Sequence, residues 1–287
     1  MSKSRTMARP AGGVRFRWGL WLAIILMLLA CLFPVWWIVV SAFTPKELLL
    51  SSPPRYLPTN VSFDNFLALF QQMDAGRALF NSISLSVVTT LATVVLSFLA
   101  AYAFARYTFR GAELIFVLLM VSSALPPIAT VIPLFGQFGN LNLIDTLQGL
   151  EILMTSAMMP FTVWILTLFI RNVPLEIEEA ARVDGANLFI ILVGIVVPLT
   201  LPAIGTMLVI NFIHSWNELF YPLIFSQTPN SQPLSLGLLN LSGAYAEMGK
   251  PWDMISALSL LMILPIVAVV LLFEPLITRG LALGQEK

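Results

Sequence analysis

The sequence "EEAARVDGANLFIILVGIVVP", residues 178–198, joins two different helix patterns. It begins with charged residues and alanines, turns at Gly185, and then becomes uncharged and strongly apolar. Glycine readily adopts the left-handed backbone conformation that ends many helices. The stretch therefore predicts a short polar helix, a bend at Gly185, and the beginning of a helix that crosses a membrane.

The polar part is predicted to begin near Pro174, because proline suits the first turn of a helix, where its missing N–H is not needed. The glutamates that follow favour the positive end of the helix dipole; they are Glu176, Glu178 and Glu179. A slim face is formed at helical spacing by Ile177, Ala180, Ala181 and Asp184. A helix of about three turns is marginal in water, so it is expected to rest on a partner. From the residues alone, a solvated connector on the membrane surface is the alternative.

The composition of the whole chain is that of a membrane protein. Hydrophobic residues make up 58% of the 287 residues and charged residues only 10%, whereas soluble domains carry about 25% charge. The formal net charge is zero, so no basic field indicates binding to nucleic acid. Cys31 is the one cysteine and His214 the one histidine, which excludes an internal disulfide and a Cys/His zinc site.

Six uncharged runs are long enough to cross a bilayer core of about 30 Å as helices. They show no alternation of the kind that membrane barrels require, so residues 18–277 are predicted to form an all-α domain with six membrane helices. The first run is too long for the core of a typical signal peptide and is expected to be retained. The expected spans, which follow these runs with up to two flanking residues at an end, are residues 19–43, 81–105, 114–138, 150–171, 188–213 and 254–275.

Prolines recur within these runs, and each one removes a backbone hydrogen bond and can kink a helix. Kinked packing and bent helices that rearrange around a pathway both remain open as interpretations. The prolines are Pro34, Pro126, Pro127, Pro133, Pro160, Pro198, Pro202 and Pro265.

The distribution of Lys and Arg predicts the orientation, because cytoplasmic loops carry the excess of positive charge. An N-terminus in the cytoplasm puts eleven of them inside: Lys3, Arg5, Arg9, Arg15, Arg17, Arg106, Arg110, Arg171, Arg182, Arg279 and Lys287. Four lie outside: Lys46, Arg55, Arg77 and Lys250. Both termini are therefore predicted to be cytoplasmic, with a basic tail at 1–17 and a second tail at 278–287. Residues 172–187 are then a cytoplasmic loop and residues 226–253 an outer loop.

The energy for any transport is expected to come from outside this chain. No run carries a charge near its middle, where proton and ion relays usually have one. The closest approach to a phosphate-binding loop is "GAYAEMGKP", residues 243–251. It has five residues where such a loop has four, and a proline follows its lysine, so the chain is not expected to bind ATP.

The opening stretch resembles the EAA loop of permease subunits of binding-protein-dependent ABC importers. In that family the pattern is Glu-Ala-Ala, three residues, Gly, nine residues, and then Ile-x-Leu-Pro. The chain matches it at Glu179 to Ala181, at Gly185, and at Ile195 with Pro198, and departs from it at Val197. The segments at 159–186 and 212–225 ("FIHSWNELFYPLIF") are similar to the MalG-like branch, which imports sugars.

The resemblance implies the fold, function and partners of the chain. It implies the six-helix domain of a type I ABC importer permease that forms half of the pathway for a sugar or related polyol. The implied partners are a second, MalF-like permease, two cytoplasmic ATP-binding subunits, an extracytoplasmic solute-binding protein and membrane lipid. ATP and Mg²⁺ are then bound by the partner ATPase subunits, and this chain holds no cofactor. The implied location is the cytoplasmic (inner) membrane of a bacterium or archaeon.

The resemblance also implies which residues couple the chain to its ATPases. They are Glu178, Glu179, Ala180, Ala181, Arg182, Asp184, Gly185 and Pro198. Residues that could line the substrate pathway are polar or aromatic and lie near span ends or bends, and for each of them packing or helix capping is the alternative role. They are Asn81, Ser82, Ser122, Asn211, Trp216 and Asn217.

Three other functions are compatible with a chain of this composition. A secondary carrier or channel would act without ATP, and the lack of central charges counts against it. A membrane-embedded enzyme would need a catalytic cluster, for which one histidine, one cysteine and no buried acid pair leave little material. A sensor or scaffold that transports nothing is the third.

Overall fold

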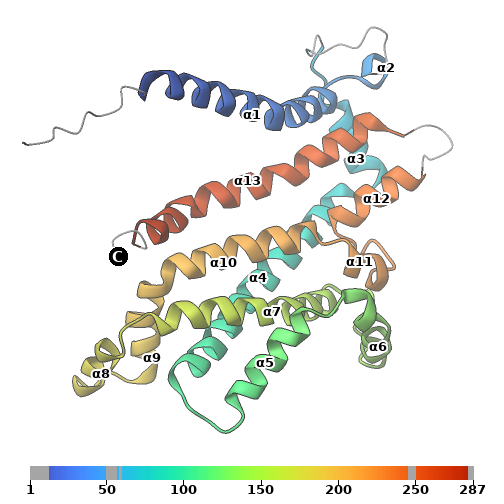
Figure 1. The fold of residues 1–287 in the computed structure, drawn as a ribbon. Coiled ribbons are helices and arrows are strands. Elements are labelled where there is room, and N and C mark those ends of the chain that lie inside the picture. The colour runs from blue at the N-terminus through green and yellow to red at the C-terminus, as the bar shows by residue number, and fades with distance from the viewer. Residues whose placement is uncertain (1–12, 50–56, 58–59, 245–249, 284–287) are drawn as a thin grey trace, which may run out of the picture. The chain divides into compact units, whose positions relative to one another are not determined.

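The computed structural model describes residues 13–49, 57, 60–244 and 250–283, and their regular structure is entirely helical (Figure 1). Several predicted segments reach beyond these residues. Residues 1–12 of the N-terminal tail, 245–249 of the outer loop and 284–287 of the C-terminal tail lie outside the described part.

The chain forms two compact units, and α13 (Trp252–Leu283) contributes to both. The smaller unit consists of Met1–Phe66 and Trp252–Leu260. It contains α1 (Gly13–Ala42), α2 (Lys46–Leu49) and the beginning of α3 (Asp64–Gln72). The side-chain amide of Asn65 donates to the carbonyls of Ala42 and Thr44, at 3.0 and 2.9 Å, which ties the beginning of α3 to the end of α1.

The larger unit consists of Leu67–Pro251 and Leu261–Lys287 and carries the remaining helices. In chain order they are α4 (Ala75–Arg106), α5 (Ala112–Ser123), α6 (Pro127–Asn140), α7 (Leu147–Arg171), α8 (Leu175–Val183), α9 (Leu188–Ile191), the π-helix η1 (Leu192–Val196), α10 (Val197–Asn217), α11 (Phe220–Phe225) and α12 (Leu234–Ala244). Helices α4, α7 and α10 pack side by side, with α8 and α9 at one end and α11 and α12 at the other (Figure 1).

Among the described residues, five helices are long and apolar enough to cross a membrane, and a bent pair can supply a sixth. The bent pair stands where a single span at 114–138 was expected. Helices α5 and α6 meet there at 102°. Pro126 and Pro127 cause the break, because a residue that precedes proline is driven out of the helical conformation, and Pro126 is extended with ψ 133°.

The fifth span is also interrupted, at the position of the family's Ile-x-Leu-Pro pattern. The N–H of Val197 donates to the carbonyl of Leu192, five residues back, which makes η1 one widened turn. Pro198 follows in the first turn of α10. A proline within a helix has no N–H to donate, and its ring crowds the preceding turn, so the wider turn relieves the crowding.

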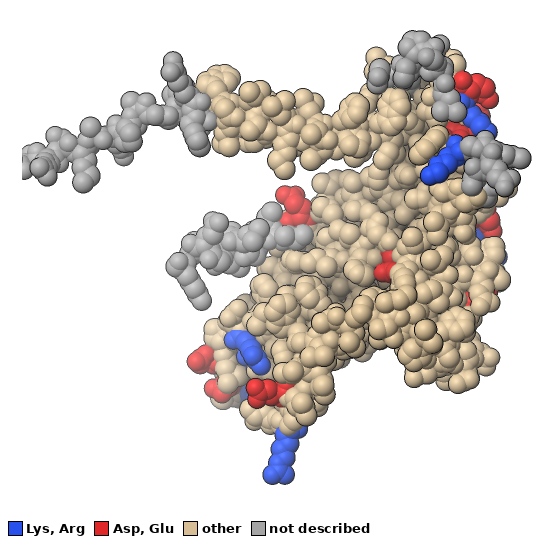
Figure 2. Space-filling view, turned by 45° about the vertical axis from the view of Figure 1, so that its right-hand side comes forward, with Lys and Arg blue, Asp and Glu red and all other residues tan. Residues whose placement is uncertain are grey.

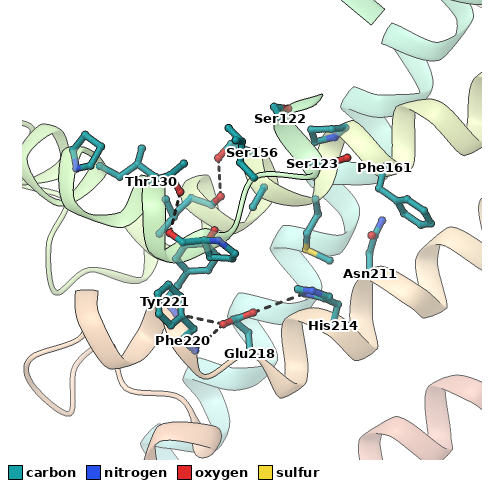
Figure 3. A pocket seen from close by; sticks show the side chains of 18 of the residues that line it. Ser122, Ser123, Thr130, Ser156, Phe161, Asn211, His214, Glu218, Phe220 and Tyr221 are labelled. Carbon is teal, nitrogen blue, oxygen red and sulfur yellow. Dashed lines mark hydrogen bonds and ion pairs between the residues drawn. The ribbon is translucent and has the colours of Figure 1, made fainter. Parts of the chain in front are cut away.

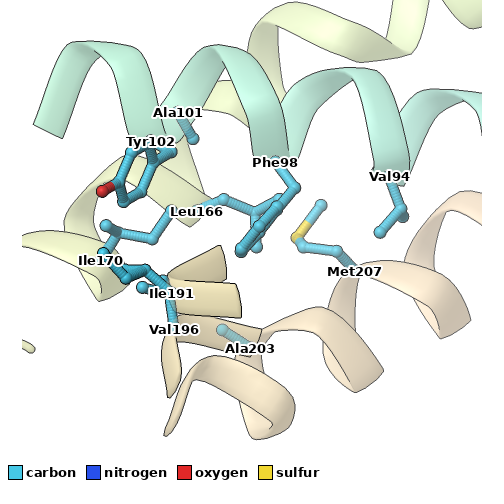
Figure 4. Close-up of a cluster of buried hydrophobic side chains, with 10 residues drawn as sticks. All are labelled: Val94, Phe98, Ala101, Tyr102, Leu166, Ile170, Ile191, Val196, Ala203 and Met207. Atoms are coloured by element: carbon cyan, nitrogen blue, oxygen red, sulfur yellow. The ribbon is translucent and has the colours of Figure 1, made fainter. Parts of the chain in front are cut away.

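A cluster of buried apolar side chains joins α4, α7 and α10 at the α8 end (Figure 4). Lipid tails are as apolar as leucine, so these contacts hold helices together by close packing rather than by exclusion of water. Ala181 of α8 packs against the cluster. The cluster consists of Val94, Phe98, Ala101, Tyr102, Leu166, Ile170, Ile191, Val196, Ala203 and Met207.

Candidate functional site: the α8 helix and the α5–α11 pocket

Helix α8 has the boundaries that its sequence predicts. Pro174 is its N-cap, and Gly185 follows its C-cap with a φ of +88°. The N–H of Gly185 donates to the carbonyl of Arg182, and that of Ala186 to the carbonyl of Ala181, at 3.0 and 2.9 Å. This pair of bonds is the Schellman ending, which requires a left-handed residue. The predicted short polar helix and the bend at Gly185 are therefore confirmed.

The inner side of α8 is fixed to the end of α4 by a buried ion pair. The Glu178 side chain is fully buried, and its Oε1 lies 2.7 Å from Nε of Arg106. The hydroxyl of Tyr102 donates to Oε2 of Glu178 at 2.8 Å, and Nη2 of Arg106 donates to the carbonyl of Val173 at 2.8 Å. Both carboxylate oxygens of Glu178 therefore have a partner, which is the condition under which a buried charge is tolerated.

The outer side of α8 is available to another molecule. Val183 is 88% exposed and Ile177 42% exposed, while Glu179, Ala180, Arg182 and Asp184 are also exposed. The two alanines of the motif divide between the two sides, because Ala180 is exposed and Ala181 is half-buried on the core. Pro198 is exposed at the beginning of α10. Figure 2 shows a largely uncharged face with the charged side chains of the α8 end gathered at its lower margin.

A pocket of about 790 Å³ lies toward the other end of the helices (Figure 3). It is enclosed by the α5–α6 bend, α7, the end of α10, and α11. Its aromatic lining residues are Phe161, Phe220 and Tyr221. Its polar lining residues are Ser122, Ser123, Thr130, Gln137, Ser156, Asn211, His214 and Glu218. A few polar groups on a mainly apolar, aromatic wall are typical of a small-molecule site.

Glu218 is the one acidic residue among the described residues that line the pocket. Its Oε1 accepts the backbone N–H groups of Phe220 and Tyr221, at 2.7 and 3.3 Å. Its Oε2 lies 3.9 Å from Nδ1 of His214, whose side chain is 61% exposed. Burial and the charge of Glu218 both raise the pKa of Tyr221, so its phenol keeps its proton at neutral pH and can donate a hydrogen bond.

A second acidic residue, Asp145, ties together two loops at the pocket end. Its carboxylate accepts bonds from the hydroxyls of Thr228 and Ser231 and from the N–H groups of Gln227 and Thr228, at 2.6–2.9 Å. Burial acts to raise its pKa, but the bonds from Ser231, Thr228 and Gln227 outweigh it and lower the pKa to about 2. The carboxylate is therefore ionised throughout the neutral range.

Of the six residues predicted for the substrate pathway, the pocket brings together Ser122 and Asn211. Asn81 is buried and donates to the carbonyls of Pro229 and Gln232, and buried Ser82 accepts the N–H of Leu234. Trp216 is buried and donates through Nε1 to the carbonyl of Met262, and Asn217 donates to that of Ile213. None of these four side chains lines the pocket. Asn81, Ser82 and Trp216 are buried against other segments, whereas Asn217 is exposed and bonds only to its own helix.

Sequence reasoning missed two features of the site, and weak signals existed for both. Tyr102 and Arg106 are four residues apart on α4 and so share a face, but Arg106 was counted only toward topology. Glu218 lies within residues 212–225, the segment that is similar to the MalG-like branch, but it was not predicted to belong to the site. The described residues contain no group of three or more His, Cys, Asp or Glu that could hold a metal ion.

Among the described residues, five or six helices are long and apolar enough to cross a membrane. Helix α8 is held to the end of α4 by a buried ion pair, and a pocket is lined by residues of α5, α6, α7, α10 and α11. These features indicate a multi-pass membrane protein with a small-molecule site. Residues 93–282, more than half of the chain, match the family described as "Binding-protein-dependent transport system inner membrane component". The chain belongs to this family and is a permease subunit of an ABC importer, as its sequence predicts.

Relatives and solved structures agree with this assignment. The trehalose transport system permease protein SugB of Mycobacterium tuberculosis is 31% identical over 89% of this chain and 92% of its own length. The trehalose/maltose transport system permease protein MalG of Thermococcus litoralis is 31% identical over 92% of this chain and 94% of its own length. A chain of a bacterial ABC transporter that imports the acidic polysaccharide alginate is 20% identical. It superposes with a TM-score of 0.79 over 94% of this chain and 99% of its own, which confirms the predicted fold class.

Proposed function

We propose that this chain forms half of the translocation pathway of an ATP-driven importer for a carbohydrate or related polyol, and that α8 couples it to the ATPases. The observation that carries the proposal is the two-sided character of α8. One side is bound to α4 through the ion pair of fully buried Glu178. On the other side, the side chains of Val183 and Ile177 are exposed. Two exposed apolar side chains among polar ones, on a helix held firmly on its other side, suit a surface that binds another protein.

The contacts of α8 define two routes by which its displacement reaches the membrane helices. The ion pair from Glu178 to Arg106 leads to α4. The Schellman turn at Gly185 leads into α9, η1 and α10. Because Arg106 also binds the carbonyl of Val173, the segment that enters α8 is held to α4 as well. A push on the outer face of α8 would therefore move the ends of α4 and α10 together.

The proposed partners are a second, MalF-like permease, two cytoplasmic ATP-binding subunits that hold ATP and Mg²⁺, and an extracytoplasmic solute-binding protein. The family description supports the binding protein. One structural neighbour, an alginate transporter with a TM-score of 0.65, was solved with its oligosaccharide-bound periplasmic protein. ATP hydrolysis is assigned to the partner subunits.

The proposed location is the inner membrane, with both termini in the cytoplasm. Its support is that α8 lies at the end of the helices where Arg106 and Arg171 also lie. Arg106 binds Glu178 of α8, and Arg171 donates to the carbonyl of Phe104 in the last turn of α4. Positive charge gathers on the cytoplasmic side of membrane proteins, so this end is assigned to the cytoplasm.

The proposed substrate class is supported by relatives and by the pocket. SugB and MalG are named for trehalose and for trehalose and maltose, and a further relative from Bacillus subtilis, AraQ, is named for arabinooligosaccharides. The hydroxyl, amide and aromatic lining of the pocket suits a ligand with many hydroxyl groups on an apolar ring.

The test is reconstitution of the chain with its partner subunits in liposomes, with uptake of labelled trehalose, maltotriose and arabinotriose measured with and without ATP. We expect uptake that requires ATP and the binding protein. Uptake by the purified chain alone, without ATP, would show a carrier or channel instead.

A photo-crosslinking amino acid at Val183 tests the coupling surface, with the same amino acid at Phe80 as control. Both positions are well exposed, at 88% and 65%, but Phe80 lies near the opposite end of α4. We expect crosslinks to an ATP-binding subunit from position 183 and none from position 80. Equal crosslinking from both positions, or none from 183, would remove α8 from the coupling route.

A further inference from the structure

We infer that the α5–α11 pocket is a binding site on this chain for neutral, hydroxyl-rich saccharides, and that Glu218 makes it select against acidic sugars. The inference rests on the proposed function, because it names the substrate class of an importer. The inference goes beyond the proposed function because it places a residue that determines specificity in this subunit.

The hydroxyl groups of the pocket wall are arranged as acceptors. A hydroxyl has one proton and two lone pairs. Four of the pocket hydroxyls donate that proton to a backbone carbonyl of their own helix. Ser122, Ser123, Thr130 and Ser156 each donate to the carbonyl three residues back, at 2.7, 2.8, 3.1 and 2.7 Å. Because each hydroxyl oxygen also has two lone pairs, these four groups can still accept hydrogen bonds, and the wall favours a molecule that brings its own donors.

Glu218 adds a negative charge to this acceptor-rich wall. Oε1 is engaged by the N–H groups of Phe220 and Tyr221, which fixes the carboxylate with Oε2 beside His214. Oε2 is thus left to accept a bond from a ligand hydroxyl. Hydrogen bonds to a charged acceptor are about twice as strong as neutral ones, so sugar hydroxyls gain most from this position.

An acidic sugar would find no counter-charge in the pocket. Among the described residues that line it, none is Lys or Arg, and His214 is the one basic group. A carboxylate brought near Glu218 would be repelled and would also lose its hydration. The alginate importer shares the fold but imports an acidic polysaccharide, which is consistent with specificity residing in the site and not in the fold.

The aromatic residues of the wall complete a saccharide site. Phe161 and Tyr221 approach the pocket from α7 and α11, and both are labelled in Figure 3. Aromatic rings offer a flat apolar face against which the C–H face of a sugar ring can pack. Neutral saccharides combine such faces with many hydroxyl donors, and therefore fit both parts of the wall.

The test measures binding to the assembled importer in nanodiscs without its binding protein, by saturation-transfer NMR. The neutral probes are trehalose, maltotriose and arabinotriose, and the acidic probe is trigalacturonate. Glu218→Gln keeps Oε1 for the two backbone N–H groups but removes the charge. Glu218→Lys reverses the charge. Glu113→Gln, at an exposed acid outside the pocket, is the matched control.

We expect the wild type and Glu113→Gln to bind at least one neutral probe and to bind trigalacturonate at least tenfold more weakly. Glu218→Gln should weaken the binding of neutral probes about tenfold, as expected for the loss of one charged hydrogen bond. It should also reduce the ratio of the affinity for neutral probes to the affinity for trigalacturonate. Glu218→Lys should reverse that ratio. A ratio unchanged in Glu218→Gln, with ATP-driven sugar uptake intact, would overturn this inference and leave the proposed function standing. Absence of ATP-driven uptake in the wild type would overturn the proposed function itself.

Discussion

Helix α4 holds a distant segment of the chain at each of its ends, and it does so by different chemistry. At one end Arg106 and Tyr102 bind Glu178 of α8, and the ion pair is almost wholly buried. At the other end Asn81 and Ser82 bind the backbone between Pro229 and Leu234 at 2.8–3.1 Å. The first contact is charged on both sides, and the second is neutral throughout.

The two contacts are expected to differ in what a single substitution costs. Removing one member of a buried ion pair leaves an uncompensated charge and costs about 3–5 kcal/mol. Losing a neutral amide bond costs about 1–3 kcal/mol when its partner is left unpaired. Substituting one member of the contact at the α8 end is therefore expected to cost more stability than substituting one member at the pocket end. Under the proposed function, the costlier contact lies where movement would enter the membrane helices, and the less costly one lies toward the pocket.

The largest expected effect is that of Glu178→Ala. The variant leaves Arg106, at the end of α4, without its counter-ion, and we expect the free energy of unfolding to fall by about 3–5 kcal/mol. Thermal unfolding of the detergent-solubilised importer would measure it. Glu179→Ala is the matched control, because Glu179 is the adjacent glutamate but is exposed. It should change stability by no more than about 0.5 kcal/mol while reducing ATP-driven uptake.

The double variant Arg106→Met with Glu178→Met removes both members of the ion pair, so that no buried charge is left without a partner. Replacing a whole buried ion pair by apolar side chains is often neutral or stabilising, so the double variant should be more stable than Glu178→Ala. If the two glutamate variants, at 178 and 179, lost equal stability, the contrast between the ends of α4 would be wrong.

Gly185→Pro is expected to abolish uptake and to uncouple ATP hydrolysis while leaving membrane insertion intact. Gly185 has a φ of +88°, which proline, fixed near −65°, cannot adopt. Its N–H bond to Arg182 is lost as well. Gly185→Ala should reduce uptake partly, because the left-handed conformation costs other residues about 1–2 kcal/mol. Gly136→Ala, where a Cβ meets nothing within 4 Å, serves as the control. Normal uptake by Gly185→Pro would show that transport does not depend on the left-handed turn at Gly185.

The predictable features of the fold are those encoded by neighbouring residues. The apolar runs, the short helix after Pro174 and the left-handed turn at Gly185 follow from local chemistry, and the structure has them. The 102° bend between α5 and α6 was not expected. A count of apolar residues measures the length of a run but not its direction. Pro126 and Pro127 marked the place of the bend without giving its angle.

The features that could not be predicted depend on pairs of residues far apart in the sequence. Glu178 looks like one of three glutamates at the beginning of a helix, and nothing nearby shows that its partner is Arg106, 72 residues earlier. Asn81 likewise looks like a polar residue available at a span end, while its partners lie 148 and 151 residues later. Local patterns predict where a polar side chain is, and only the packing shows whether it is already occupied.

Asn81→Ala tests the neutral end of α4. The variant leaves the carbonyls of Pro229 and Gln232 without their donor, and we expect a loss of about 1–3 kcal/mol in the free energy of unfolding. Asn240→Ala is the control, since its 3.5 Å bond to Gln232 is exposed and should matter little. Hydrogen exchange should show faster opening between residues 227 and 234 in Asn81→Ala, with α8 unchanged. Faster exchange in α8 as well would mean that the two ends are not independent.

The smallest expected effect concerns the middle of α4, between its two ends. The hydroxyls of Ser86, Thr89, Thr90 and Thr93 are buried without a hydrogen-bond partner. Thr93→Val replaces such a hydroxyl by a methyl group and should stabilise the protein by about 1 kcal/mol, because the unpaired group is removed.

Thr162→Val is the matched comparison for Thr93→Val. The hydroxyl of Thr162 is buried but bonded to the carbonyl of Met158 and to Asn211, so its loss should destabilise the protein. The unfolding temperatures of the two variants, each compared with the wild type, measure these opposite changes in stability. If Thr93→Val lost as much stability as Thr162→Val, the Thr93 hydroxyl would have to be bonded in solution. The middle of α4 would then be held by polar contacts as both of its ends are, and the contrast would lie only in charge.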